Sequence, residues 1–158
     1  MPIFSKMFEK AESNFIDYNG KKVIQLDKIE SFDKFKITLK LLSTNSQWKQ
    51  AIAIKIHTGS MTVDNIIKGK YFLFWEDDLR LEPENTVIIY GKTKDNFISV
   101  WNACEVIHST PFNSSKCTEA WTMGCAMIKG ENGVYYCNDF DSNDDFDDLI
   151  FQIKVEEQ

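Results

Sequence analysis

The chain has 158 residues, a length that suits one domain with a single core. Its 43% hydrophobic and 13% aromatic residues, among them twelve Phe, five Tyr and four Trp, exclude an intrinsically disordered chain. The net charge of −6 and the single arginine, Arg80, argue against a nucleic-acid partner, because contact with phosphates requires clustered Lys and Arg.

The N-terminal stretch MPIFSKMFEKAESNF has charged residues within every apolar window and lacks the small-residue cleavage site of a secretory signal. The sequence also has no apolar run long enough to predict a membrane span. We therefore expect a protein that is cytoplasmic as synthesised, with release by a non-classical route left open. In that compartment Cys104, Cys117, Cys125 and Cys137 are expected to be free thiols, and the absence of a C-x-x-C pair argues against a zinc site.

The predicted elements begin with a helical or irregular arm over residues 1–20. Phe4 and Phe8 are spaced by four positions, which predicts a helix near residues 3–11. Alternating apolar and polar residues then predict six half-buried antiparallel strands. These strands span residues 22–26, 34–42, 51–57, 70–76, 86–93 and 97–103.

Three more strands are predicted in the C-terminal third, at residues 123–129, 134–138 and 149–155. The first two are joined by Gly130-Glu131-Asn132-Gly133, whose Gly and Asn residues tolerate the positive φ angles of a tight hairpin. The polar segment 109–116 is interpreted as a turn. About nine short strands with little room for crossover helices predict an all-β fold, a jelly-roll-like antiparallel β-sandwich formed by the single domain 1–158.

The segment before the last strand carries six aspartates within ten residues, and their combined charge equals the net charge of the protein. The spacing of Asp139, Asp141 and Asn143 is the D-x-D-x-N start of many calcium loops, in which every second side chain turns towards the ion. A divalent ion would also relieve the repulsion between crowded carboxylates. We therefore expect Ca²⁺ as the cofactor. The expected main ligands are Asp139, Asp141, Asn143 and Asp145, supported by Asp147 or Asp148, with Asp144 as a further candidate.

This segment is not an EF-hand, because Asp144 stands where that pattern has Gly, Ile150 stands where it has Glu, and strands flank the loop. Magnesium fits less well, since it keeps several waters and seldom needs so many carboxylates. The alternative is a solvated acidic turn without an ion, which blunts the end of a sheet and aids solubility.

The stretch 138-NDFDSNDDFDDLIFQI-153 resembles the closing segment of uncharacterised bacterial β-sandwich domains that end in D-F-x-D-L-[VI]-F. The resemblance implies that the aspartates bind calcium. A weaker similarity links the segment to galactose-binding bacterial calcium lectins, although Cys137 interrupts the Tyr-Asn step and the loop is shorter. The residues similar to the ion loop of those lectins are Tyr136, Asn138, Asp139, Asn143 and Asp144.

Aromatic side chains supply candidates for stacking against a sugar ring, although most rings in a β-sandwich belong to the core. The candidates are Trp48, Trp75, Trp101, Trp121 and the adjacent Tyr135 and Tyr136. Trp121 is the best of these, because the hairpin that follows it leads into the acidic segment. By analogy with calcium lectins, the expected ligand-binding residues are Asn138, Trp121 and Tyr136.

A second acidic patch, Glu76-Asp77-Asp78, is interpreted as a solvated turn that would approach the main loop only if both occupied the same end of the sandwich. His57 and His108 are too isolated to indicate a metalloenzyme site. The G-x-S-x-G, H-E-x-x-H and glycine-rich phosphate motifs do not occur, so we expect no enzyme and no catalytic residues, with a spatially formed Cys–His pair left open.

These observations lead to two hypotheses. The first is a non-enzymatic, calcium-binding, lectin-like module that recognises carbohydrate. The second is a self-assembling structural protein of a coat, matrix or inclusion, in which the ion stabilises the fold or bridges subunits. Carbohydrate or further copies of the chain, as a homo-oligomer, are thus the expected partners.

Overall fold

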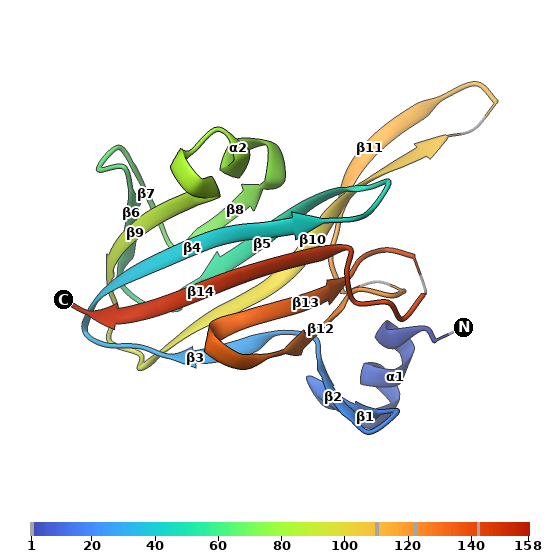
Figure 1. The fold of residues 1–158 in the computed structure, drawn as a ribbon, viewed down its shortest axis with the longest axis horizontal. Coiled ribbons are helices and arrows are strands. Elements are labelled where there is room, and N and C mark those ends of the chain that lie inside the picture. The colour runs from blue at the N-terminus through green and yellow to red at the C-terminus, as the bar shows by residue number, and fades with distance from the viewer. Residues whose placement is uncertain (1, 110, 122, 142) are drawn as a thin grey trace.

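The computed structural model describes residues 2–109, 111–121, 123–141 and 143–158, so that Ser142 of the predicted ion loop lies outside the described residues. Two antiparallel sheets pack face to face, with a short helix near the N-terminus (Figure 1). The predicted all-β sandwich is therefore confirmed.

Within the described part of the chain, the larger sheet has nine strands. Their spatial order is β1 (Phe15–Tyr18), β2 (Lys21–Ile24), β12 (Ala126–Lys129), β13 (Val134–Asn138), β14 (Leu149–Glu157), β4 (Lys34–Thr44), β9 (Thr86–Lys92), β6 (Ser60–Val63) and β7 (Ile67–Gly69).

The smaller sheet has five strands among the described residues. Four follow the order β11 (Ser114–Glu119), β10 (Phe97–Ser109), β5 (Lys49–Lys55) and β8 (Tyr71–Trp75). The fifth, β3 (Asp27–Glu30), pairs with the beginning of β10. The helical segments are α1 (Phe4–Ala11), α2 (Glu76–Arg80) and the two 3-10 turns η1 (Pro83–Asn85) and η2 (Glu131–Gly133).

The alternation of apolar and polar side chains along β4 explains how the two sheets pack together. Phe35, Ile37, Leu39 and Leu41 are buried between the sheets, while the lysines between them point away from the core. Each such side chain contributes about 1.5–3 kcal/mol when it is removed from water. Because β4 lies between β14 and β9, this row sits near the middle of the larger sheet.

The nine predicted strands and the N-terminal helix are present with shifted ends, and five further strands lie outside the prediction: β1, β3, β6, β7 and β11. The most consequential is β11, because the turn predicted over 109–116 is wrong from Ser114 onwards. The sequence of β11 is SSKCTE, which has no apolar alternation to reveal it. Its pairing with β10 depends on backbone hydrogen bonds, which do not require apolar side chains.

The second acidic patch is also corrected, because Glu76, Asp77 and Asp78 form the first turn of α2. Carboxylates are favourable there because the N-terminus of a helix carries partial positive charge. The predicted hairpin turn 130–133 is present as η2, and Asn132 and Gly133 have the positive φ angles of 57° and 74°.

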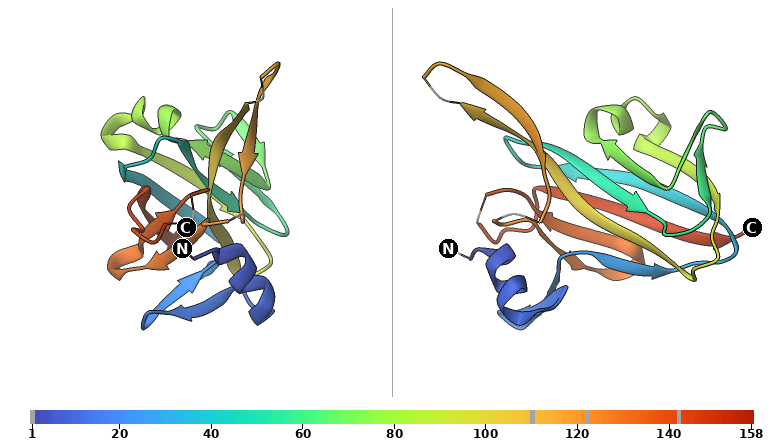
Figure 2. Two further views of the ribbon diagram at one scale, coloured as in Figure 1. Left: turned by 90° about the vertical axis from the view of Figure 1, so that its right-hand side faces the viewer. Right: turned by 180° about the vertical axis from the view of Figure 1, so that it is seen from behind.

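Strands β10 and β11 extend past the rest of both sheets as a two-stranded ribbon (Figure 2). The loop between β13 and β14 lies near the base of this ribbon, on the same side of the molecule as α1 (Figure 1). Among the described residues, no helix combines the length and the apolar character needed to cross a membrane.

Candidate functional site

The predicted ion loop, residues 139–148, connects β13 to β14 at one end of the sandwich; we call it the acidic loop. Two other segments hold it. On one side Phe4 of α1 packs against Phe146, with their ring centroids 5.5 Å apart. On the other side lies the β4–β5 turn, residues 45–48, whose Asn45 N–H donates to the carbonyl of Asp148 at 3.0 Å.

The β4–β5 turn supplies neutral hydrogen-bond donors to the first half of the acidic loop. Asp139 is 1% exposed and accepts from the Ser46 hydroxyl and, at 3.1 Å, from Gln50 Nε2. Asp141 Oδ2 accepts from Trp48 Nε1 at 3.2 Å and from Gln47 Nε2 at 3.3 Å. These two predicted ligands therefore have partners within the protein.

Asn138 positions the loop from the end of β13. Its side chain is fully buried, with Oδ1 accepting from the Phe146 N–H at 2.7 Å and Nδ2 donating to the Asn143 carbonyl. Phe146 has a φ of 52°, which places it in the left-handed region. Both ends of the Asn138 amide therefore shape the loop, and its expected role in ligand contact stays a prediction.

A glycine allows the chain to pass close behind the acidic loop. A Cβ atom at Gly124 would lie 2.1 Å from the carbonyl oxygen of Asp141. The Gly124 N–H points to the carbonyl of Phe140, with the nitrogen and oxygen 3.5 Å apart. Any larger residue at this position would displace the backbone of the loop.

The second half of the loop brings three carboxylates together. Oxygens of Asp145, Asp147 and Asp148 all lie within 4.8 Å of one another, and we call these residues the carboxylate cluster. Asp145 is exposed, Asp147 is half-buried and Asp148 is buried. Asp147 Oδ2 accepts from Asn45 Nδ2 at 2.9 Å, whereas its buried Oδ1 has no hydrogen-bond partner within the described ranges.

In the part of the chain that the structure describes, no ion pair balances this charge. Within the described ranges, the ion pairs involve none of the loop aspartates. Asp144 is likewise paired with a neutral group, the Tyr18 hydroxyl, at 3.1 Å. The buried Oδ1 of Asn143, another predicted ligand, has no hydrogen-bond partner among the residues that the structure describes.

The electrostatic consequence is largest at Asp148. Burial, followed by the negative charge of nearby Asp139, raises the pKa of Asp148 to about 7. The Asp139 N–H donates to Asp148 Oδ2 at 3.0 Å and offsets part of this shift. The pKa of Asp145 is also raised, first by desolvation and then by the charge of Asp147.

The two acidic patches meet at the same end of the sandwich through Gln50. Its backbone N–H donates to Glu76 Oε2 at 3.1 Å, while its side-chain amide donates to Asp139. Glu76 is also 3.4 Å from Arg80, and Asp77 is 3.0 Å from Lys49. The patch on α2 therefore has positive partners, unlike the acidic loop.

The candidate stacking residues Trp121 and Tyr136 lie in different parts of the fold. Trp121 follows β11 and lies 5.1 Å from Trp101 of the smaller sheet, and Tyr71 lies 5.7 Å from Trp101, measured between ring centroids. We call Tyr71, Trp101 and Trp121 the aromatic row. Tyr136 belongs to β13 of the larger sheet.

Trp121 also borders a polar cavity of about 460 Å³. Its other walls come mainly from α1 and the following turn. The lining residues include Ser5, Glu9, Glu12, Asn14 and Gln25. This combination of an aromatic wall with hydrogen-bonding groups was not predicted, because α1 is distant from Trp121 in the sequence.

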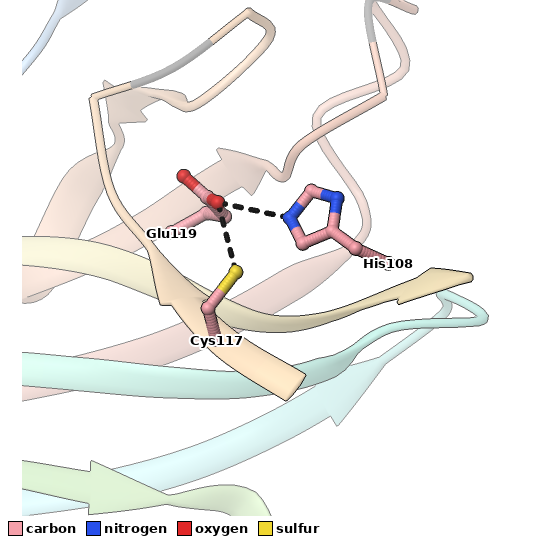
Figure 3. A group of neighbouring side chains, drawn as sticks. All are labelled: His108, Cys117 and Glu119. Carbon is pink, nitrogen blue, oxygen red and sulfur yellow. Dashed lines mark hydrogen bonds and ion pairs between the residues drawn. The ribbon is translucent and has the colours of Figure 1, made fainter. Parts of the chain in front are cut away.

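The sequence prediction also missed a cluster on the ribbon, formed by His108, Cys117 and Glu119 (Figure 3). Glu119 Oε1 lies 3.0 Å from Cys117 Sγ and 3.3 Å from His108 Nε2. Because β11 was not predicted, nothing in the sequence pattern placed these three residues together.

Comparison with protein-family models, curated proteins and solved structures finds no match to this chain.

We predict that the ion-free protein loses stability as the pH rises from about 4 to about 7. In this interval folded Asp148 keeps a proton that the unfolded chain releases, so the folded state loses its advantage as the pH rises. The contribution to the slope is at most about 1.4 kcal/mol per pH unit. Urea unfolding in chelator, at several pH values across this interval, measures it.

Asp148→Asn should remove that part of the slope, because an amide does not ionise and its oxygen still accepts the Asp139 N–H. The exposed Asp17→Asn serves as the control and should keep the slope. Identical pH profiles for all three proteins would contradict the shifted titration of Asp148.

Proposed function

We propose that this protein is a non-enzymatic, calcium-binding β-sandwich that recognises carbohydrate. The observation that supports ion binding is the carboxylate cluster, in which three oxygens lie within 4.8 Å of one another. Oxygens this close together can contact one Ca²⁺ ion, whose ligands lie about 2.4 Å from it.

The ligand set is centred on Asp145, Asp147 and Asp148. Asp139 and Asp141 already receive hydrogen bonds from the β4–β5 turn, whereas Asp147 and Asn143 each have a buried oxygen with no partner among the described residues. Graded burial from Asp145 to Asp148 leaves one side of the cluster open to solvent, where waters can complete a shell of about six to eight oxygens.

We predict that saturating Ca²⁺ raises the melting temperature of the protein by about 5–10 °C, because a ligand at about 100 times its Kd stabilises a folded chain of this size by about 2.7 kcal/mol. The double variant Asp145→Asn, Asp147→Asn should lose this rise. It should melt no lower than the unmutated protein in chelator, since it removes repulsion. Differential scanning calorimetry with Ca²⁺ and with chelator makes the measurement.

Asp77→Asn with Asp78→Asn, on α2, is the matched control for the change in charge and should keep the full response. An equal calcium-induced rise in melting temperature in both double variants would show that the carboxylate cluster does not bind the ion. No response to Ca²⁺ in the unmutated protein would remove the ion altogether.

The polar cavity beside Trp121 supports carbohydrate as the ligand class. Sugar rings pack their C–H groups on aromatic faces and use hydroxyls to bond carboxylates and amides, and the cavity offers both kinds of surface. The acidic loop braces this cavity indirectly. Phe146 packs on Phe4 and Asp144 accepts from Tyr18, so the loop helps to fix α1, which forms one wall.

Trp121→Ala should abolish calcium-dependent binding on a glycan array while leaving the calcium-induced rise in melting temperature intact. Tyr136→Ala is the matched control, because the two rings are equally exposed, at 40%, but only Trp121 borders the cavity. If only Tyr136→Ala lost glycan binding, the ligand site would lie on the larger sheet and not at the cavity beside Trp121. Absence of any glycan signal with Ca²⁺ present would contradict the recognition role.

A second candidate function, self-assembly, is favoured by Phe112. This residue is 99% exposed near the tip of the β10–β11 ribbon. A cavity of about 260 Å³ elsewhere on the molecule is lined by Phe72, Phe74 and Leu79 among other residues. This cavity could accept the Phe112 ring of another copy of the chain. A contact between two different surfaces does not close on itself, so it would build chains of subunits.

If the chain assembles in this way, light scattering should detect large particles at high protein concentration, and Phe112→Ala should dissolve them. Phe15→Ala, which removes a ring that is 51% exposed elsewhere, should leave them intact. A monomer at all concentrations would exclude the assembly role.

A further inference from the structure

The register of the ribbon places His108, Cys117 and Glu119 on one face. Cys104 pairs with Glu119, Val106 with Cys117 and His108 with Ser115, so these side chains point to the same side. At the base of this face Cys104 and Val106 are buried in the core. On the opposite strand Cys117 and Glu119 are half-buried, and His108, further along the ribbon, is exposed.

The spacing of the three ligand atoms suits a small tetrahedral ion. In tetrahedral zinc sites, nitrogen and oxygen ligands lie about 2.0–2.2 Å and sulfur about 2.3 Å from the metal, which puts neighbouring ligand atoms about 3.3–3.7 Å apart. Glu119 Oε1 is 3.3 Å from His108 Nε2 and 3.0 Å from Cys117 Sγ, and all three ligand atoms lie within 4.8 Å (Figure 3). The side chains therefore need only small movements to surround an ion.

The order of contacts is unlike that of a nucleophile and its base. Glu119 stands between the thiol and the imidazole, so the carboxylate, and not the histidine, accepts from Cys117 (Figure 3). This hydrogen bond raises the pKa of Cys117 and so favours the thiol over the thiolate in the absence of a metal. An activated cysteine would instead contact the histidine directly.

We propose that His108, Cys117 and Glu119 form a second metal site, which binds one Zn²⁺ ion and is independent of the acidic loop. Sulfur and imidazole ligands favour zinc over calcium, which takes oxygen ligands. On binding, the metal replaces the thiol proton, which leaves to solvent, and the charges of one thiolate and one carboxylate neutralise the ion.

Three protein ligands leave the fourth position of the zinc ion open. Zinc sites of this kind hold a water or an external ligand there, whereas structural sites are closed by four protein ligands. Phe140 of the acidic loop borders the site, with its ring 6.4 Å from His108 and 6.2 Å from Trp48 between centroids. The open position therefore lies on a surface beside the acidic loop and is accessible to a small donor from solvent.

The test uses the full chain, stripped of metal, kept reduced and saturated with Ca²⁺ so that the acidic loop is occupied. Co²⁺ serves as the spectroscopic probe for zinc. We expect a near-ultraviolet charge-transfer band, which requires a thiolate ligand, together with the visible bands of tetrahedral cobalt and their loss when one equivalent of Zn²⁺ displaces it. Cys117→Ser should abolish the charge-transfer band. His108→Gln should weaken zinc binding at least about tenfold, since even the loss of a group that only supports a ligand costs that much.

His57→Gln, which removes the other histidine from an exposed position, is the matched control and should bind zinc as the unmutated protein does. A second readout needs no variant. Cys117 is the one cysteine of the four that is not buried, so an alkylating reagent reports on it, and Zn²⁺ should slow its modification. Absence of the charge-transfer band, unprotected Cys117, or equal zinc affinity in His108→Gln and His57→Gln would each overturn the proposal.

Discussion

Uncompensated negative charge at one end of the sandwich is the constraint on which this account depends. The acidic loop packs against α1 and the β4–β5 turn and accepts hydrogen bonds from hydroxyl, amide and indole groups, and among the described residues none of its aspartates forms an ion pair. Neutral donors satisfy Asp139 and Asp141 without cancelling their charge. The unbalanced charge acts most strongly on Asp148, which is buried and whose pKa is raised to about 7. Either a proton or a cation must accompany this carboxylate in the folded protein.

The fold explains why this charge is tolerated at that place. The loop is covalently bounded by β13 and β14, and β14 is paired along its length with the central strand β4. The apolar residues of these strands hold the loop in position whether or not it is electrostatically favourable. In the proposed function, an ion would stabilise a loop that the core already holds in place, and Phe146 would connect that loop to α1 and the cavity beside Trp121.

How much of this was predictable from the sequence depends on how local the signal is. The alternation of apolar and polar residues in β4 and β14 predicted the sandwich, because a strand with one buried face shows this pattern over consecutive residues. The aspartates of the loop were equally visible. The sequence did not show which aspartates would form the cluster, because the side chains that bind the loop, Asn45, Ser46 and Gln50, lie some 90 to 100 positions away. The cluster of His108, Cys117 and Glu119 was hidden for a similar reason, because the polar strand β11 carries no apolar pattern.

The most direct test of the central claim is a high-resolution crystal structure of the protein grown with calcium, with an anomalous difference map. The account predicts one anomalous peak bounded by carboxylate oxygens of Asp145, Asp147 and Asp148, at about 2.3–2.6 Å from each. A map with only ordered water among these carboxylates, at a calcium concentration in the millimolar range, would contradict it.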